Sequence, residues 1–241
     1  TWLLPSPDFD ESKKYPLILE IHGGPHAMYG NTFYHELQVY AAGGYLVLYC
    51  NPRGSTGAGQ QFVNAAAGDW GGCDYRDLMD VVDHVSKFRY VDTSRMGVTG
   101  GSYGGYMTNW IITQTDRFKA AVTQRSTVNR HNLYGTSDLV WSYASWEFGG
   151  SAYERPDFYL ERSPLTYIKN VSAPVLIMHS ENDFRCPVEQ SEQLFVALKL
   201  HGKTTEYIRF PNESHGLSRT GRPDHRVERL DRAAEWFDRY L

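Results

Sequence analysis

The chain carries Gly100-Gly101-Ser102-Tyr103-Gly104-Gly105 at the junction between a strand-like stretch, residues 95–99, and a helical stretch, residues 103–115. A serine between glycines at such a junction is typical of a nucleophile elbow, a strained turn that exposes the hydroxyl. A side chain at Gly100 or Gly104 would crowd the neighbouring backbone. Glycine-rich turns of this kind also bind phosphates, so the interpretation depends on an acid and a histidine farther along the chain.

Composition places the chain among ordinary globular proteins. Its 241 residues are 41% hydrophobic and 22% charged, with a net charge of −4. This length fits one large α/β domain with a sizeable core. The absence of a basic surplus argues against a nucleic-acid partner.

The sequence shows no sign of a metal site, a disulfide framework or a membrane segment. The three cysteines, Cys50, Cys73 and Cys186, are odd in number and widely spaced, which favours reduced thiols in a cytoplasmic protein without a bound metal or cofactor. No apolar run approaches the roughly 20 residues of a membrane span. The chain begins at Thr1 without a signal peptide or an initiator methionine, and we interpret it as a piece of a longer protein.

Apolar runs of strand length alternate with helical stretches, which predicts a mostly parallel sheet with helices on both faces. The expected strands are 2–4, 17–22, 45–50, 95–99, 120–123, 175–179 and 206–210, and the expected helices are 32–42, 75–87, 103–115, 188–200 and 224–241. Asp74 is a candidate N-cap of the second helix, and Pro187 suits the first turn of the fourth. Residues 124–172 break the alternation, and we expect an excursion with short helices and pocket residues there.

The acid and the histidine follow the serine in the order typical of the α/β-hydrolase fold. Asp183 comes just after the strand 175–179, with Glu181 as the second choice, although a loop aspartate that caps the next helix would look the same. His215 follows the last strand and precedes the final helix, in which His225 is its nearest competitor. His179 ends a strand and is expected to be a packed, hydrogen-bonded neighbour of the site.

A second loop supplies candidate donors for an oxyanion hole. The backbone N–H of Tyr103 is one donor, and the loop after the first long strand offers Gly24 or, alternatively, Gly23. A simple glycine–proline turn is the structural alternative. A metal site at His22 and His26 is disfavoured because no third ligand is suitably spaced.

Taken together, the motifs resemble the catalytic domain of the prolyl oligopeptidase family of serine peptidases, in its acylaminoacyl-peptidase-like branch. They are collinear over the whole chain: His22-Gly23-Gly24-Pro25, Asn51-Pro52-Arg53-Gly54-Ser55-Thr56-Gly57, Asp69-Trp70-Gly71-Gly72, residues 100–107, Asp183-Phe184-Arg185 and Ser214-His215-Gly216. The resemblance implies one α/β-hydrolase catalytic domain over residues 1–241. It also implies an N-terminal β-propeller in the parent protein, which is absent from this chain and would screen substrates by size.

By this resemblance Ser102 is the nucleophile, His215 the base and Asp183 the acid, with Tyr103 and Gly24 forming the oxyanion hole. His22 occupies the position at which other branches place an oxyanion-hole tyrosine. Ala58 and Cys186 depart from the usual residues outside the triad. Arg185 falls where the branch has an arginine close to substrate carbonyls, although it would equally pair with nearby carboxylates.

The expected function is acyl transfer from a peptide or N-acylated peptide through an acyl-enzyme intermediate. The alternatives are a carboxylesterase acting on small esters and, more remotely, a non-catalytic binding domain. Trp146, with Trp141 and Tyr143, is a candidate apolar pocket wall, although ordinary core positions fit as well. Arg125 and Arg130 could reach a substrate carboxylate, with surface ion pairs as the simpler interpretation. The oligomeric state is left open.

Overall fold

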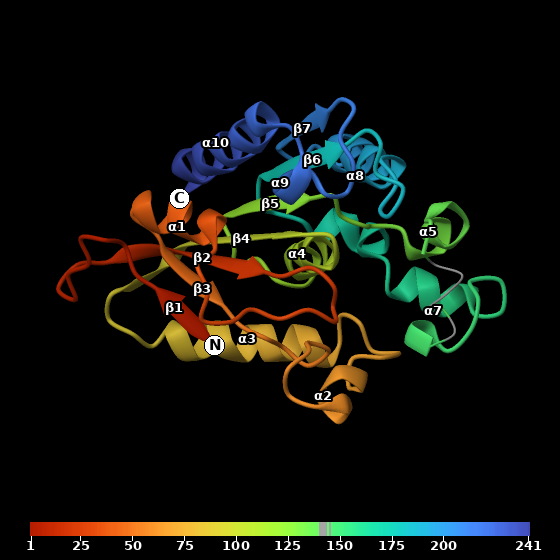
Figure 1. Cartoon of the computed structure of the whole chain (residues 1–241), viewed down its shortest axis with the longest axis horizontal. Coiled ribbons are helices and arrows are strands. Elements are labelled where there is room, and N and C mark those ends of the chain that lie inside the picture. The colour runs from red at the N-terminus through yellow and green to blue at the C-terminus, as the bar shows by residue number, and fades with distance from the viewer. Residues whose placement is uncertain (140–143, 145) are drawn as a thin grey trace.

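A twisted central sheet organises the molecule. The computed structural model describes residues 1–139, 144 and 146–241, and within them the sheet has seven strands in the order β1-β3-β2-β4-β5-β6-β7 (Figure 1). The strands are Trp2–Leu4 (β1), Tyr15–Ile21 (β2), Leu46–Tyr49 (β3), Val91–Gly101 (β4), Ala120–Gln124 (β5), Val175–Ser180 (β6) and Thr205–Phe210 (β7). Strand β1 is antiparallel to β3, and the other neighbouring strands pair in parallel.

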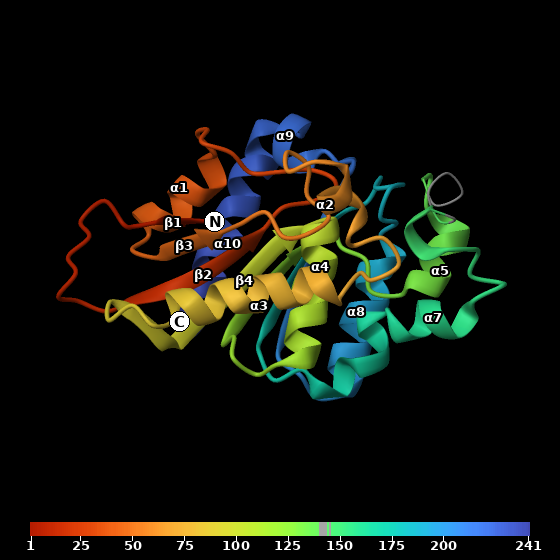
Figure 2. The same cartoon turned by 90° about the horizontal axis from the view of Figure 1, so that it is seen from below.

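Long helices cover both faces of this sheet. Figure 2 shows α3 and α4 lying across one face, whereas α1 and α10 lie on the other side in Figure 1. The long helices are His35–Ala42 (α1), Cys73–Val85 (α3), Tyr103–Gln114 (α4), Glu189–Leu200 (α8) and Pro223–Tyr240 (α10).

The strands are apolar on both sides because each face is buried under helices. In β2, Leu17 and Leu19 belong to the core shared with α3, α4 and α8, whereas Ile18 belongs to the core shared with α1 and α10. All three side chains are fully buried. Successive side chains of a strand point to opposite faces, so a continuous apolar run supplies both cores.

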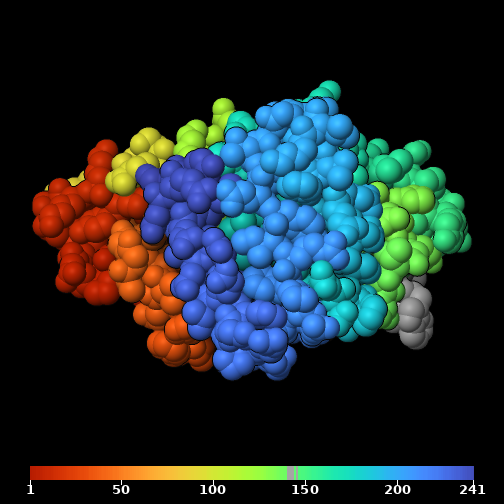
Figure 3. Space-filling model, turned by 90° about the horizontal axis from the view of Figure 1, so that it is seen from above, coloured from red at the N-terminus to blue at the C-terminus, as the bar shows by residue number. Residues whose placement is uncertain are grey.

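Short helices occupy the loops. They are Gln60–Asn64 (α2), Arg130–Thr136 (α5), Pro156–Glu161 (α7), the 3₁₀ helix Pro164–Asn170 (η1) and Leu217–Thr220 (α9). Three of them, α5, α7 and η1, lie in the excursion between β5 and β6. Figure 3 shows the C-terminal part of the chain in the middle of one face, between the N-terminal part and this excursion.

The predicted fold class is confirmed, and each predicted strand and long helix is present with shifts of a few residues at its ends. Pro187 lies two residues before α8 rather than in its first turn. Helices α2 and α9 were not predicted, because stretches of four or five residues show no helical periodicity. The predicted excursion does carry short helices.

The predicted cap of the second helix is wrong. Gly72 is the N-cap of α3, and the Asp69 carboxylate accepts the backbone N–H of Cys73 at 2.8 Å. Asp74 lies inside the first turn and is fully buried, where it accepts a hydrogen bond from the Tyr103 hydroxyl at 2.6 Å. The sequence shows an aspartate at the start of the helix, but it does not show that a tyrosine 29 residues away donates a hydrogen bond to it in the interior.

Candidate active site

The junction of β4 and α4 is a strained turn centred on Ser102. The serine has φ 62° and ψ −122°, in a region that residues other than glycine rarely adopt. Its N–H donates to the Gln124 carbonyl at 3.0 Å, and its own carbonyl accepts the N–H of Tyr106 at 2.9 Å. The turn is therefore fixed on one side to β5 and on the other to the first turn of α4.

Close backbone packing explains the glycines around the serine. A Cβ at Gly104 would lie 2.0 Å from the Ile21 carbonyl oxygen, and one at Gly100 would lie 2.6 Å from the backbone of Gly104. No side chain fits at either distance. The crowding expected at both positions is therefore present, because α4 begins directly against the end of β2.

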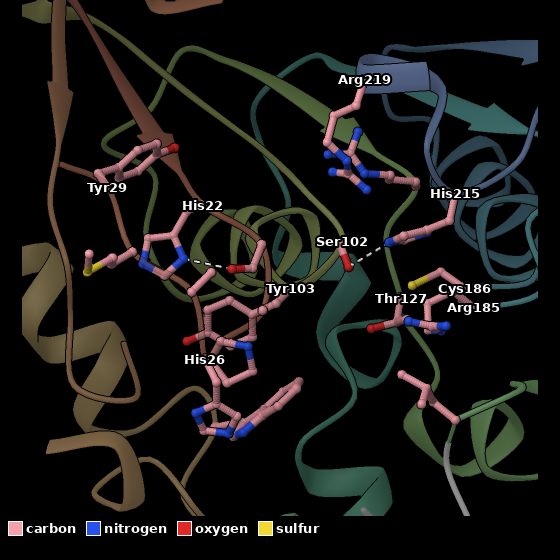
Figure 4. A pocket seen from close by; sticks show the side chains of 18 of the residues that line it. His22, His26, Tyr29, Ser102, Tyr103, Thr127, Arg185, Cys186, His215 and Arg219 are labelled. Atoms are coloured by element: carbon pink, nitrogen blue, oxygen red, sulfur yellow. Dashed lines mark hydrogen bonds between the residues drawn. The ribbon is translucent and has the colours of Figure 1, made fainter. Parts of the chain in front are cut away.

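Three loops bring a serine, a histidine and an aspartate together. The Nε2 atom of His215 lies 3.0 Å from Oγ of Ser102, and its Nδ1 atom lies 2.7 Å from Oδ2 of Asp183. Figure 4 shows the first of these hydrogen bonds at the cavity wall. Ser102 follows β4, Asp183 follows β6 and His215 follows β7, so all three lie at the carboxyl edge of the sheet.

Asp183 is held by its own loop. Its Oδ1 atom accepts the backbone N–H groups of Arg185 at 3.0 Å and Cys186 at 2.9 Å, which leaves Oδ2 for His215. Burial disfavours the carboxylate, but hydrogen bonds with His179 and His215 outweigh that effect and hold the pKa of Asp183 well below its usual range. The aspartate is therefore ionised at neutral pH.

His179 has the predicted position beside the site. It is buried, with Nδ1 2.5 Å from Oγ of Ser191 and Nε2 2.6 Å from the Cys186 carbonyl oxygen. Its Nε2 atom also lies 3.5 Å from Oδ2 of Asp183. His179 thus connects the acid loop to α8.

The pKa values of the His215 imidazole and of the nearby Cys186 thiol are both shifted. Burial lowers the pKa of His215, although the hydrogen bond to Asp183 opposes the shift. Burial also raises the pKa of the Cys186 thiol to about 12. Near neutral pH the histidine can therefore accept a proton, while the cysteine stays protonated and does not compete as a nucleophile.

The other candidate triad members are paired elsewhere. The carboxylate of Glu181 accepts a hydrogen bond from Arg209 at 3.2 Å, at the surface. His225 lies in α10 with Nδ1 2.8 Å from a Glu213 carboxylate oxygen. Neither side chain contacts Ser102.

Two residues whose backbone N–H groups are unpaired within the described ranges line the cavity at Ser102. Tyr103 and Gly24 both line the same cavity as Ser102. Among the described residues, neither N–H forms a hydrogen bond within the protein. A Cβ at Gly23 would lie 3.4 Å from that of Ser102, so the 23–24 loop approaches the serine closely. These two backbone donors are therefore available to a ligand in the cavity.

A cavity of about 710 Å³ opens at Ser102 and is lined by both the early loops and the excursion. His22 and His26 are part of this wall but have protein partners, His22 with Oγ of Ser55 at 2.9 Å and His26 with the Glu147 carboxylate. Within the described ranges, no cluster of side chains suited to a metal ion is present.

The predicted substrate-binding side chains both line the cavity. Arg185 donates to the Asp138 carboxylate at 2.6 Å, so the ion-pair interpretation holds for its guanidinium. Trp146 is 48% exposed, and its ring centroid lies 4.8 Å from that of His26. Trp141 and Tyr143 lie outside the described residues.

Arg125 and Arg130 form no surface ion pair within the described part of the chain, so the simpler interpretation of both residues does not hold. Arg125 is half-buried, and its buried Nε atom has no hydrogen-bond partner. Arg130 is buried among aromatic rings. Both side chains line the cavity.

The packing of Tyr103 against Trp70 and Asp74 was not predicted from the sequence. Trp70 packs edge-on against the Tyr103 ring at 4.9 Å and donates its indole N–H to Glu147 at 2.8 Å. Asp74 accepts the hydroxyl of Tyr103. These partners are 29 to 77 residues apart in the chain, and no local pattern indicates such contacts.

No helix in the described ranges is long and apolar enough to cross a membrane.

A family model described as "Prolyl oligopeptidase family" matches residues 31–241. Among curated proteins, the chain is 54% identical over 241 residues to the "Uncharacterized peptidase YuxL" of Bacillus subtilis, covering 100% of this chain and 37% of that protein. It is 34% identical over 248 residues to the dipeptidyl-peptidase 5 of Porphyromonas gingivalis, covering 100% of this chain and 36% of that protein. The chain thus spans little more than a third of these relatives.

Solved structures of peptidases also match this chain over its whole length. The acylaminoacyl peptidase of Pyrococcus horikoshii superposes with a TM-score of 0.95 at 38% identity, over 100% of this chain and 39% of that one. An acylaminoacyl peptidase in complex with Z-Gly-Gly-Phe-chloromethyl ketone matches with the same TM-score of 0.95, identity of 38% and coverage of 100% and 39%.

Proposed function

The chain belongs to the prolyl oligopeptidase family, and from this premise we propose that it is a serine peptidase domain that cleaves peptide or N-acyl-peptide bonds through an acyl-enzyme. The observation that carries the proposal is the continuous hydrogen-bonded connection from Ser102 through His215 to Asp183. Each member sits on a different sheet loop, and the acid is ionised while the imidazole is neutral near pH 7.

In the first half-reaction, Oγ of Ser102 attacks the substrate carbonyl carbon while Nε2 of His215 takes the hydroxyl proton. Asp183 accepts the Nδ1–H of His215, which fixes the tautomer and stabilises the imidazolium. The developing oxyanion accepts hydrogen bonds from the N–H groups of Tyr103 and Gly24.

The bond to the leaving group then breaks, and His215 returns the proton to the departing amine. The acyl group remains on Ser102. In the second half-reaction His215 removes a proton from water, whose oxygen attacks the acyl carbon, and Ser102 regains its proton. No metal or cofactor takes part in this scheme.

The proposed substrate class follows from the relatives. One solved acylaminoacyl peptidase holds an N-blocked tripeptide chloromethyl ketone, and the curated relatives are named peptidases. We therefore propose N-blocked or short peptides as substrates. A larger parent protein is consistent with the 36% to 39% of each relative that the chain covers.

Labelling with a fluorophosphonate tests the nucleophile. Wild-type protein and Ser12→Ala, which alters an exposed serine bonded to Asp10, should label equally, whereas Ser102→Ala should not label. Equal labelling of Ser102→Ala would contradict the assignment. No labelling of the folded wild type would favour a binding domain.

A comparison of rates tests the substrate class. The substrates are acetyl-aminoacyl anilides, dipeptide anilides with a free amino group, and p-nitrophenyl esters. The proposal predicts hydrolysis of the anilides, fastest for the acetylated ones. Turnover of esters alone would identify a carboxylesterase instead.

A further inference from the structure

We propose that the cavity contains a subsite for a carboxylate side chain on the acyl side of the scissile bond, with Arg130 as its anchor. The preferred substrates would carry glutamate or aspartate immediately before the cleaved bond. This inference rests on the proposed function, because it takes Ser102 as the atom that receives the acyl group.

Arg130 is held in an aromatic cage. The residue is 3% exposed. Its guanidinium carbon lies 4.2 Å from the ring centroid of Trp70, 4.3 Å from that of Phe148 and 5.0 Å from that of Tyr106. The rings attract the cation and fix the plane of the guanidinium. They offer its N–H groups no conventional acceptor.

The guanidinium lacks a carboxylate partner. Its Nη2 atom is buried without a hydrogen bond, and within the described residues no acidic side chain pairs with Arg130. Arg229, the other strongly buried arginine, by contrast donates to Glu36 at 2.7 Å and 3.1 Å. A buried cation without an acceptor is costly. A ligand carboxylate would remove that cost.

The carboxylate of Glu147, which contacts Trp70 of the aromatic cage, already has two hydrogen-bond partners. Glu147 accepts hydrogen bonds from His26 on one oxygen and from the Trp70 indole on the other. It is fully buried. Glu147 therefore orients Trp70 beneath the guanidinium and does not serve as the partner of Arg130.

Arg130 lies on the side of Ser102 where the acyl group would bind. The leaving group must be within reach of His215, and Figure 4 shows His215 and Tyr103 on opposite sides of Ser102. The ring of Tyr103 contacts that of Trp70 at 4.9 Å, and Trp70 contacts Arg130. All of these residues line one cavity, so an acyl side chain can extend over Tyr103 towards the guanidinium.

The chemistry of the guanidinium selects the ligand. A planar fork of N–H donors matches the two oxygens of a carboxylate, and a charged acceptor gives stronger hydrogen bonds than an amide. A lysine or arginine side chain would be repelled by the cation. The value of kcat/KM should therefore be higher for substrates with glutamate before the cleaved bond than for those with glutamine, and lowest for those with a basic residue.

The test compares acetyl-X-p-nitroanilides with X as Glu, Gln, Phe and Lys, on wild type, Arg130→Met, Arg130→Lys and Arg239→Met. Arg239 is the matched control, because it lies over the Trp236 ring at 5.5 Å but is not part of the cavity wall. Arg130→Lys keeps the positive charge but lacks the planar set of N–H donors. It therefore still tests the proposal if Arg130→Met fails to fold. The readout is the ratio of kcat/KM values between substrates.

In wild type we expect kcat/KM for Glu to exceed that for Gln by about tenfold or more. Arg130→Met should bring this ratio close to one, Arg130→Lys should reduce it, and Arg239→Met should leave it unchanged. A wild-type ratio near one, or an unchanged ratio in both Arg130 variants, would overturn the subsite while the peptidase assignment stands.

If no anilide is cleaved, calorimetry on Ser102→Ala separates the two proposals. Tighter binding of acetyl-glutamyl amide than of acetyl-glutaminyl amide, lost when Arg130→Met is added, would support the subsite although the proposed function had failed. Equal binding of the two amides would overturn the subsite.

Discussion

The Nδ1 atom of His215 lies 2.7 Å from Oδ2 of Asp183, although the two residues are 32 positions apart. The other oxygen of the carboxylate accepts backbone N–H groups of its own loop. The aspartate therefore has one orientation and presents its second oxygen to the imidazole. This geometry fixes which nitrogen of His215 faces Ser102.

Replacing Asp183 by asparagine should reduce kcat by roughly 10⁴, because an amide can donate to Nδ1 and stabilise the wrong tautomer. The matched control is Glu181→Gln, which alters the acid that pairs with Arg209 at the surface. Steady-state kinetics on the best anilide would check both variants. Comparable activity of Asp183→Asn and wild type would remove Asp183 from the triad.

The pH profile should have an acid limb set by His215. The imidazole must be neutral to accept the serine proton, and burial lowers its pKa. The value of kcat/KM should therefore rise with pH through a midpoint below about 6.5, the ordinary histidine pKa. Asp183 does not add a limb there, because its pKa is far lower. A midpoint above that ordinary value would contradict the assignment of His215.

The buried Asp74 should make the protein less stable as the pH rises. Burial raises the pKa of Asp74 to about 6, against the effect of the hydrogen bond from Tyr103. The native state therefore binds the proton more tightly than the unfolded chain, in which the pKa is about 3.9. The free energy of unfolding should fall by roughly 3 kcal/mol as the pH rises through this window.

Denaturant titrations between pH 4 and 7 would measure this loss. Asp74→Asn removes the titrating group and should flatten the pH dependence, even if its stability is lower throughout. Asp80→Asn, on the exposed side of the same helix, should retain the wild-type slope. An unchanged slope in Asp74→Asn would assign the effect to another group.

Gly104→Ala should destabilise the fold by about 3 kcal/mol or more, because the added Cβ would lie 2.0 Å from the Ile21 carbonyl oxygen. Gly135→Ala is the control, because a Cβ there meets nothing within 4 Å. Its stability should be unchanged or higher by up to about 1 kcal/mol. Thermal unfolding of the two variants checks both expectations, and equal stability would contradict the close contact of α4 with β2.

Local patterns predicted the scaffold because they depend on near neighbours. The run 17–19 is apolar at successive positions because β2 is buried on both faces, and the glycines around Ser102 are required by contacts of the turn itself. The positions of Asp183 and His215 followed from the strands before them. Parallel strands end at one edge of the sheet, so the loops after them meet in space.

Contacts between distant segments were not predicted. Asp74 is predicted to cap a helix, but its side chain is buried and accepts a hydrogen bond from Tyr103. A surface ion pair is the simpler interpretation of Arg130 from sequence, with a contact to a substrate carboxylate as the other. The residue is buried instead, and its burial depends on Trp70 and Phe148, which lie on either side of it in the chain. Burial of a polar side chain depends on which aromatic rings surround it, and neighbouring residues in the sequence do not reveal this.

By itself, the sequence determined the strand and helix order, the strained turn at Ser102 and the order of serine, acid and histidine. These features follow from backbone sterics and from side-chain periodicity, which are properties of short stretches of chain. Only the tertiary structure decided that Oγ of Ser102 lies 3.0 Å from His215 and that the cavity wall beyond Tyr103 contains a caged guanidinium. Distances and burial arise from packing between segments that are far apart in the chain.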